Sequence, residues 1–187
     1  MASIILYHSV LGLRPVEKAL AAEWRNAGHA VATPDLFDGR TAETYDGGFA
    51  ILNDIGLKTV TERALAAADE QPDNLVLAGV SMGAGMASRA WSAKPGASGV
   101  LFIAGPAPWP EMVSGTPVQM HAARPEPFDG EEVFDEWRSE NPGARLEEFR
   151  YDDVGHYFLD ASLPDYSEAA SKACRQRCLE FLATLQT

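Results

Sequence analysis

Short apolar runs alternate with helical patterns along the first half of the chain. Ser3 to Tyr7 (SIILY) is an apolar, β-rich run, and Val16 to Ala27 repeats apolar residues at helical spacing. Ala30 to Thr33 starts a second extended run, and Ile51 to Glu70 carries a longer helical pattern. The order predicted for this half is therefore strand, helix, strand and one long helix.

The second half continues the alternation with runs that are apolar almost throughout. Such runs are typical of strands that helices cover on both faces, so we predict a mostly parallel sheet between two helical layers. No linker interrupts residues 1–187, which predicts a single α/β domain. The strands are predicted at Leu75 to Val80, Val100 to Ala104, Pro117 to His121 and Leu146 to Tyr151, and the helices at Met82 to Ala93, Gly130 to Glu140 and Tyr166 to Leu185.

Charge and composition narrow the classes of partner. The chain has 187 residues, of which 46% are hydrophobic and 22% charged, as in an ordinary globular domain. Its formal net charge of −12 disfavours nucleic acid and anionic membrane surfaces. The amino end has no basic leader, and no apolar run approaches the ~20 residues of a membrane span. We therefore expect a cytoplasmic protein, a monomer or homodimer, that acts on a small molecule.

The cysteine and histidine spacing gives no sign of a metal or cofactor. Cys174 and Cys178 lie one helical turn apart, where a disulfide would strain the helix, so we expect two reduced thiols near the core. Neither HExxH nor HxH occurs among the four histidines. A metal hydrolase is therefore disfavoured, and no cofactor is expected.

The sequence GVSMG, residues 79–83, matches the GxSxG pattern between an apolar strand and a helix of small residues. A nucleophile elbow requires this context, because its serine sits on a strained turn that the flanking glycines relieve. The helix that follows would direct its positive end toward Ser81. We therefore predict that Ser81 is a nucleophile.

A serine nucleophile needs a base, and histidine has a suitable pKa for that exchange. In this class of fold the triad follows the order serine, acid, histidine. His8 and His29 lie upstream of Ser81, and His121 leaves no room for an acid before it. His156, in the segment DDVGHYF after the last strand, is therefore the predicted base.

The acid of the triad should lie between the strand that ends at His121 and the base His156. Glu126 and Asp129 are the two candidates. Asp129 precedes GEEVFDEW and is expected to cap that helix, which leaves Glu126 freer to orient the imidazole. We favour Glu126, and Asp129 remains the second choice.

Two further features concern the binding of substrate. Backbone amides of Met82, after the nucleophile, and Val10, after the first strand, are the predicted oxyanion donors. The irregular stretch 105–115 follows a strand, so its Trp109 is a candidate pocket wall. His8 also ends a strand and is a further candidate for contact with substrate.

Taken together, these segments resemble the dienelactone hydrolase family of the α/β-hydrolase fold. The resemblance covers nearly the whole chain and rests on HSVLG, TPDLFDGR, GVSMGAG, EPF and GHYF. It implies an α/β-hydrolase fold with little or no lid, and a triad of Ser81, Glu126 and His156. The EPF segment is similar to the family's Asp-x-Phe loop, which gives a second reason for Glu126.

The sequence departs from that family's pattern at the nucleophile and near the first strand. Well-known members carry a cysteine in GxCxGG, whereas this chain has Ser81 followed by an interrupted glycine pair at Ala84. The family's acidic residue near the first strand has no match. Both differences favour ordinary serine ester hydrolysis. Arg40 and Arg124 are the candidates for the family's arginines that bind a substrate carboxylate.

The sequence thus predicts a serine hydrolase that cleaves a small ester or lactone through an acyl-enzyme. The alternative is a noncatalytic domain of the same fold that binds a small molecule or partner. Dinucleotide binding is disfavoured, because no following strand ends in an acid suited to a ribose.

Overall fold

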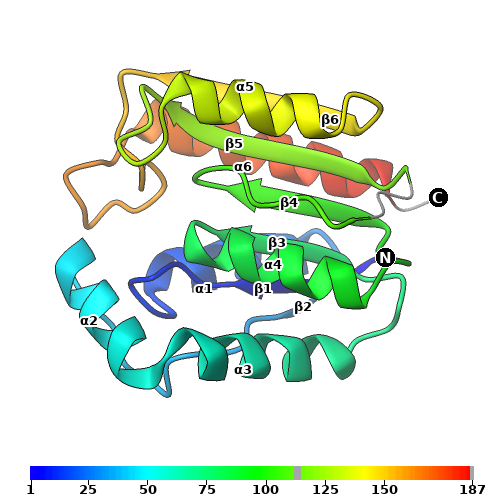
Figure 1. Cartoon of the computed structure of the whole chain (residues 1–187), viewed down its shortest axis with the longest axis horizontal. Helices are drawn as coiled ribbons and strands as arrows, with labels where there is room; N and C mark the ends of the chain where they lie inside the picture. The colour runs from blue at the N-terminus through cyan, green and yellow to red at the C-terminus, as the bar shows by residue number, and fades with distance from the viewer. Residues whose placement is uncertain (112–114, 186–187) are drawn as a thin grey trace.

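A computed structural model describes residues 1–111 and 115–185, and its centre is a sheet of six parallel strands (Figure 1). The order across the sheet is β2-β1-β3-β4-β5-β6. All six predicted strands are present, so the predicted parallel sheet is confirmed. Their bounds are β1 Ser3–Tyr7, β2 Ala30–Ala32, β3 Val76–Val80, β4 Gly99–Ile103, β5 Pro117–Arg124 and β6 Arg145–Asp152.

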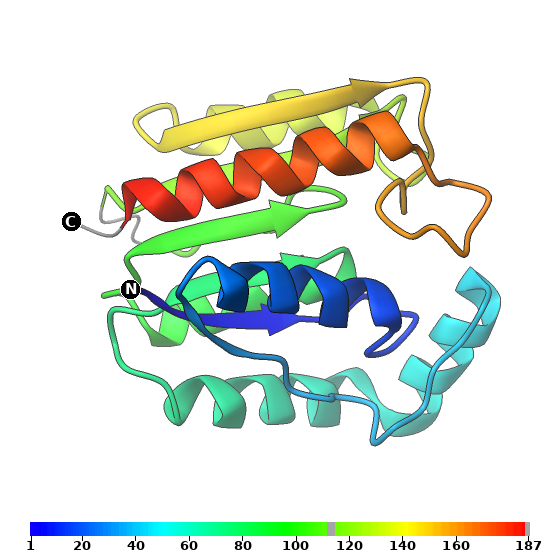
Figure 2. The same ribbon diagram turned by 180° about the vertical axis from the view of Figure 1, so that it is seen from behind.

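Helices cover both faces of the sheet, and each face has its own apolar core. Helices α3, α4 and α5 lie in front of the sheet in Figure 1, and α1 and α6 lie behind it, as Figure 2 shows from the other side. The two cores are separate clusters of buried residues, as expected for strands that are apolar throughout. The bounds are α1 Pro15–Asn26, α2 Tyr45–Ile55, α3 Leu57–Asp69, α4 Met82–Ala93, α5 Glu131–Glu140 and α6 Glu168–Thr184.

The single long helix predicted from Ile51 to Glu70 is wrong. The chain forms two helices, α2 and α3, because Gly56 between them has a φ of 87°, a left-handed conformation that a helix interior excludes. Helix α2 also starts earlier than predicted, after Thr44, whose side chain accepts a hydrogen bond from the Gly47 amide. The turn at Gly56 lets α2 pass beside the carboxyl ends of the strands (Figures 1 and 2).

The strand order places the end of β3 at a special point of the sheet. Strand β1 lies between β2 and β3, and after β3 the chain adds strands toward the opposite edge. Ligands of open α/β sheets bind at such switch points, outside the carboxyl ends of the strands. Ser81 follows the last residue of β3, so the topology places it at this edge.

Two predictions about individual segments have different outcomes. Cys174 and Cys178 are both free and fully buried in α6, as expected for thiols near the core. Of the irregular stretch 105–115, residues 112–114 lie outside the described residues.

No helix within residues 1–111 and 115–185 combines the length and apolar character that crossing a membrane requires.

Candidate active site

Ser81 forms a strained turn between β3 and α4. Its φ of 53° and ψ of −113° are unfavourable for a residue with a side chain, and its amide donates to the Ile103 carbonyl at 2.7 Å. Both flanking positions must be glycine for steric reasons. A Cβ on Gly79 would collide with the Gly83 backbone, and a Cβ on Gly83 would collide with the Tyr7 carbonyl. The turn therefore presents the Ser81 side chain at the carboxyl edge of the sheet.

His156 lies between Ser81 and Glu126, which come from distant parts of the chain. Its Nε2 is 2.8 Å from Ser81 Oγ, and its Nδ1 is 2.7 Å from Glu126 Oε1. These contacts fit a neutral imidazole whose Nδ1–H donates to the carboxylate and whose Nε2 accepts from the serine hydroxyl. The structure thus brings together the three residues predicted as nucleophile, base and acid.

Glu126, rather than Asp129, carries the hydrogen bond to His156. The Glu126 side chain is buried, and its Oε1 also accepts from the Phe128 amide at 3.3 Å. Its Oε2 has no hydrogen-bond partner among the described residues. The carboxylate is therefore oriented chiefly through the imidazole and the loop of Phe128.

Asp129 has a different position from the one predicted. The N-cap of α5 is Gly130, and no side chain caps the helix, so the predicted capping role of Asp129 is wrong. Asp129 instead lines the cavity next to Ser81. Burial and the nearby Glu126 charge raise the pKa of its carboxyl, and His156 partly opposes them.

Aromatic rings hold the loop that carries His156. Tyr45 of α2 stacks on Tyr157 with ring centroids 5.2 Å apart, and Phe128 meets the His156 ring edge-on at 4.8 Å. Asp165 joins these segments, because it accepts from the Tyr45 hydroxyl at 2.6 Å and from the Tyr157 amide at 3.0 Å. Burial and this acceptor raise the pKa of Tyr45. The imidazole is thus fixed by α2 as well as by its own loop.

Tyr157 is a site residue that the sequence reasoning missed. Its hydroxyl lies 3.2 Å from Ser81 Oγ. Burial raises the pKa of this hydroxyl, against hydrogen bonds with Ser81, Ser9 and the Val10 backbone that lower it. The GHYF segment placed Tyr157 beside the base in sequence, but nothing in the pattern indicated which way its ring points.

The two predicted oxyanion donors come from the start of α4 and from the loop after β1. Met82 begins α4, and the first amides of a helix have no partner within it. Val10 lines the same cavity as Ser81, in the loop after β1. The buried Glu17 carboxylate holds that loop, since it accepts from the Ser9 amide at 3.3 Å and the Arg14 amide at 3.1 Å. Burial raises the pKa of Glu17 despite these bonds.

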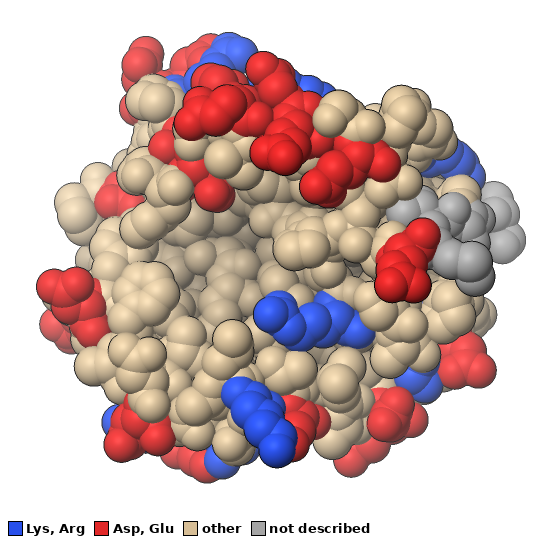
Figure 3. Space-filling view, viewed as in Figure 1, with Lys and Arg blue, Asp and Glu red and all other residues tan. Residues whose placement is uncertain are grey.

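A cavity of about 240 Å³ opens beside Ser81. Figure 3 shows a hollow in this face of the molecule, with acidic side chains gathered over α5 above it. None of the residues that line the cavity is lysine or arginine. The surroundings are therefore aromatic and acidic, with lining residues Val10, Tyr45, Phe49, Ser81, Ala104, Pro106, Phe128, Asp129, His156 and Tyr157.

Trp109 and His8, both predicted to contact substrate, are used for packing instead. The Trp109 ring stacks on Trp137 with centroids 4.7 Å apart, and its Nε1 donates to the Trp137 carbonyl at 2.8 Å. His8 is fully buried, its Nδ1 lies 2.7 Å from the Ser9 carbonyl oxygen, and its Nε2 accepts from the Leu36 amide at 3.0 Å. Burial lowers the pKa of His8. Neither ring lines the cavity beside Ser81, so both predictions are corrected.

The two arginines predicted to bind a substrate carboxylate already have acidic partners. Arg40 pairs with Asp54, and Arg124 binds both oxygens of Asp152, whose pKa this contact lowers. Both pairs are exposed and lie outside the cavity lining. The predicted role of Arg40 and Arg124 is therefore not supported by their positions.

A parallel sheet between two helical layers, with a strained serine on a strand-to-helix turn at its carboxyl edge, is the arrangement of the α/β-hydrolase fold. Three solved structures at low sequence identity share it. A dienelactone hydrolase-like promiscuous phosphotriesterase from metagenomic libraries has a TM-score of 0.76 and 18% identity, over 99% of this chain and 87% of that one. A dienelactone hydrolase from Anabaena variabilis has a TM-score of 0.64 and 16% identity, over 98% and 86%.

The third structure is esterase PE8, with a TM-score of 0.65 and 17% identity over 98% of this chain and 92% of that one. No protein-family model matches the chain, and no curated protein matches it significantly in sequence. At these identities the likeness establishes the α/β-hydrolase fold alone, as predicted. The reaction depends on the side chains of the site, which a shared fold does not fix.

Proposed function

We propose that the protein is a serine hydrolase of small, uncharged carboxylic esters or lactones. The observation that carries this proposal is the unbroken series of hydrogen bonds from Ser81 through His156 to Glu126, at the edge of a cavity. Three side chains 30 and 75 residues apart in sequence would not meet in this order by local folding alone. The hydrolases and the esterase among the similar structures agree with this assignment.

In the proposed mechanism, Ser81 Oγ attacks the carbonyl carbon while His156 Nε2 takes the hydroxyl proton. Glu126 keeps the Nδ1–H of the imidazole in place and stabilises the positive ring that forms. The amides of Met82 and Val10 bind the oxyanion. The C–O bond then breaks, and the leaving alcohol takes the proton from Nε2. Water repeats the sequence on the acyl-enzyme and releases the acid.

The charge around the cavity favours uncharged substrates. Asp129 lines the cavity, and α5 adds acidic side chains near the hollow, while no lysine or arginine lines it. A substrate carboxylate would be repelled by the Asp129 carboxylate at the cavity wall, which weakens binding and slows encounter. The volume of about 240 Å³ suits a short acyl or alcohol group.

Hydrolysis of a matched pair of esters tests this function. We expect phenyl acetate to be hydrolysed with a higher kcat/KM than 4-acetoxybenzoate, which has the same acyl group and an added carboxylate, by about tenfold at low ionic strength. Added salt should narrow the difference, because it screens the charges. If neither ester were hydrolysed, the proposed activity would be contradicted. If both were hydrolysed with equal kcat/KM, only the preference for uncharged substrates would be contradicted.

Tyr157 is proposed to assist through its hydroxyl, which can turn from Ser81 Oγ to the developing oxyanion. We expect Tyr157→Phe to lower kcat for phenyl acetate by about 10- to 100-fold, because one hydrogen bond to a charged oxygen is lost. Tyr166→Phe is the matched control, since Tyr166 is 40% exposed. An unchanged kcat in Tyr157→Phe would remove the hydroxyl from the mechanism.

A further inference from the structure

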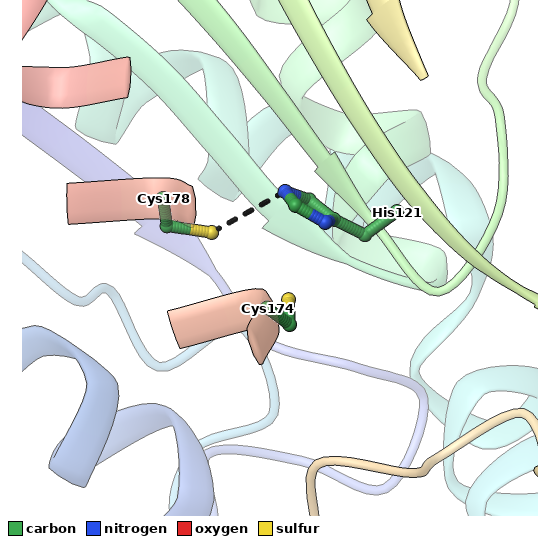
Figure 4. A group of neighbouring side chains, drawn as sticks. All are labelled: His121, Cys174 and Cys178. Carbon is green, nitrogen blue, oxygen red and sulfur yellow. Dashed lines mark hydrogen bonds between the residues drawn. The ribbon is translucent and has the colours of Figure 1, made fainter. Parts of the chain in front are cut away.

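A second group of reactive side chains lies on the α6 side of the sheet. Cys174 and Cys178 of α6 and His121 of β5 are all fully buried, and their possible ligand atoms lie within 4.8 Å of one another. The spacing of four residues puts both sulfurs on one face of the helix. Figure 4 shows the imidazole of His121 directed toward Cys178, with Nε2 3.6 Å from Sγ.

We propose that His121, Cys174 and Cys178 bind a thiolate-preferring metal ion, with Zn²⁺ as the ion of choice. One imidazole and two thiolates form a donor set that zinc prefers. Bonds of about 2.0–2.1 Å to nitrogen and 2.3 Å to sulfur, at a tetrahedral angle, separate the two atoms by about 3.5–3.6 Å. The distance between Cys178 Sγ and His121 Nε2 already has this value.

The charge balance of this group suits a buried divalent ion. Binding replaces the two thiol protons, which leave to solvent, so two thiolates and Zn²⁺ together carry no net charge. A neutral unit is tolerated in an apolar interior far better than a single buried charge. His121 stacks on the Phe149 ring at 5.3 Å, and both cysteines belong to the apolar core on this side of the sheet. The Arg177 guanidinium lies over the rings of Phe149 and Tyr151.

The hydrogen bonds of His121 can adapt to a metal at Nε2. Without a metal, Nε2–H faces Gln119 Oε1 at 2.9 Å, because the Gln119 amide nitrogen donates to Glu147. Nδ1 lies 2.9 Å from the Tyr151 hydroxyl, which can donate or accept. In the bound form Nδ1–H would donate to Tyr151, which orients the ring as outer partners of ligating histidines do. The Gln119 oxygen, which accepts from Nε2–H at 2.9 Å, would have to turn aside for the metal and would then be available as a fourth donor.

The proposal is tested by measuring the metal content of the folded 187-residue chain. We expect protein purified without chelator to hold one zinc ion per molecule. Protein unfolded with chelator and refolded with Co²⁺ should show a thiolate-to-cobalt charge-transfer band. Cys174→Ser and Cys178→Ser should each lower bound zinc at least about tenfold. Ser171→Ala, a buried change one turn earlier on α6, is the matched control and should keep both signals.

Results on the unaltered chain alone can overturn the proposal. Two free thiols in folded protein that holds no zinc and gives no cobalt band would show an ordinary thiol–imidazole contact. A disulfide between Cys174 and Cys178, seen as two missing thiols after unfolding, would contradict it equally. Neither readout involves ester hydrolysis, so the outcome is independent of the proposed activity at Ser81.

Discussion

Ser81→Ala is expected to reduce kcat/KM for p-nitrophenyl acetate by at least about 10⁴-fold. The reason is that Ser81 Oγ is the atom proposed to form the covalent bond, and alanine leaves His156 with nothing to activate. The fold should persist, because alanine removes only one oxygen from a strained turn. Initial rates with the two proteins, together with far-ultraviolet circular dichroism, measure both effects.

Ser92→Ala is the matched control for this prediction. Ser92 lies on α4, the helix that follows Ser81, and is exposed, so its loss should leave the rate unchanged. If Ser81→Ala retained most of the wild-type rate while folded, hydrolysis would occur elsewhere on the protein and Ser81 would have no part in it.

The second large effect is expected for Glu126→Gln, with kcat lowered by about 10³- to 10⁴-fold. The glutamine amide can donate to Nδ1, which favours the imidazole tautomer that carries its proton on Nε2. That tautomer cannot accept the Ser81 proton. Glu126 is buried against His156 at 2.7 Å, so water cannot easily replace the lost contact. Steady-state kinetics with phenyl acetate at a fixed pH measure the loss.

Asp129→Asn distinguishes the two acids that the sequence left open. Asp129 lines the cavity and does not bond to His156 in the part of the chain that the structure describes, so its amide variant should keep kcat within about tenfold. A greater loss in Asp129→Asn than in Glu126→Gln would exchange the roles of the two residues.

The fold was largely predictable because its strands are apolar on both faces. LVLAGV and VLFIA correspond closely to β3 and β4, since burial by two helical layers leaves no polar position in these runs. Strands β5 and β6 run beyond their predicted ends to Arg124 and Asp152, which pair with each other. Polar strand ends of this kind carry no apolar signal.

The departures from the sequence predictions have definite physical causes. Gly56 ends α2 through its backbone conformation, which helical periodicity cannot reveal. Arg40 is neutralised by Asp54 of α2, 14 positions further along the chain, a contact that depends on how α2 packs. Trp109 was expected in a pocket wall because it follows a strand, but the indole instead stacks on Trp137 of α5. Partners of this kind are set by tertiary packing.

The residues of the active site were also predictable only in part. GVSMG identified the turn at Ser81, because the glycines are required by close backbone contacts that any such turn has. The direction of a side chain is a different matter. The contacts of Tyr157 with Ser81, and of His121 with Cys178, depend on which way a ring points from its loop or strand. Sequence spacing alone does not determine that direction.

Labelling with a fluorophosphonate, followed by mass spectrometry of the digested protein, is the most direct test of an activated serine. The reagent forms a stable bond to a serine oxygen only where a base and oxyanion donors assist the attack. We predict one adduct per chain, on the peptide that contains Ser81, and none in His156→Ala. A folded protein that leaves Ser81 unmodified after prolonged exposure would contradict the hydrolase assignment and favour a binding domain of the same fold.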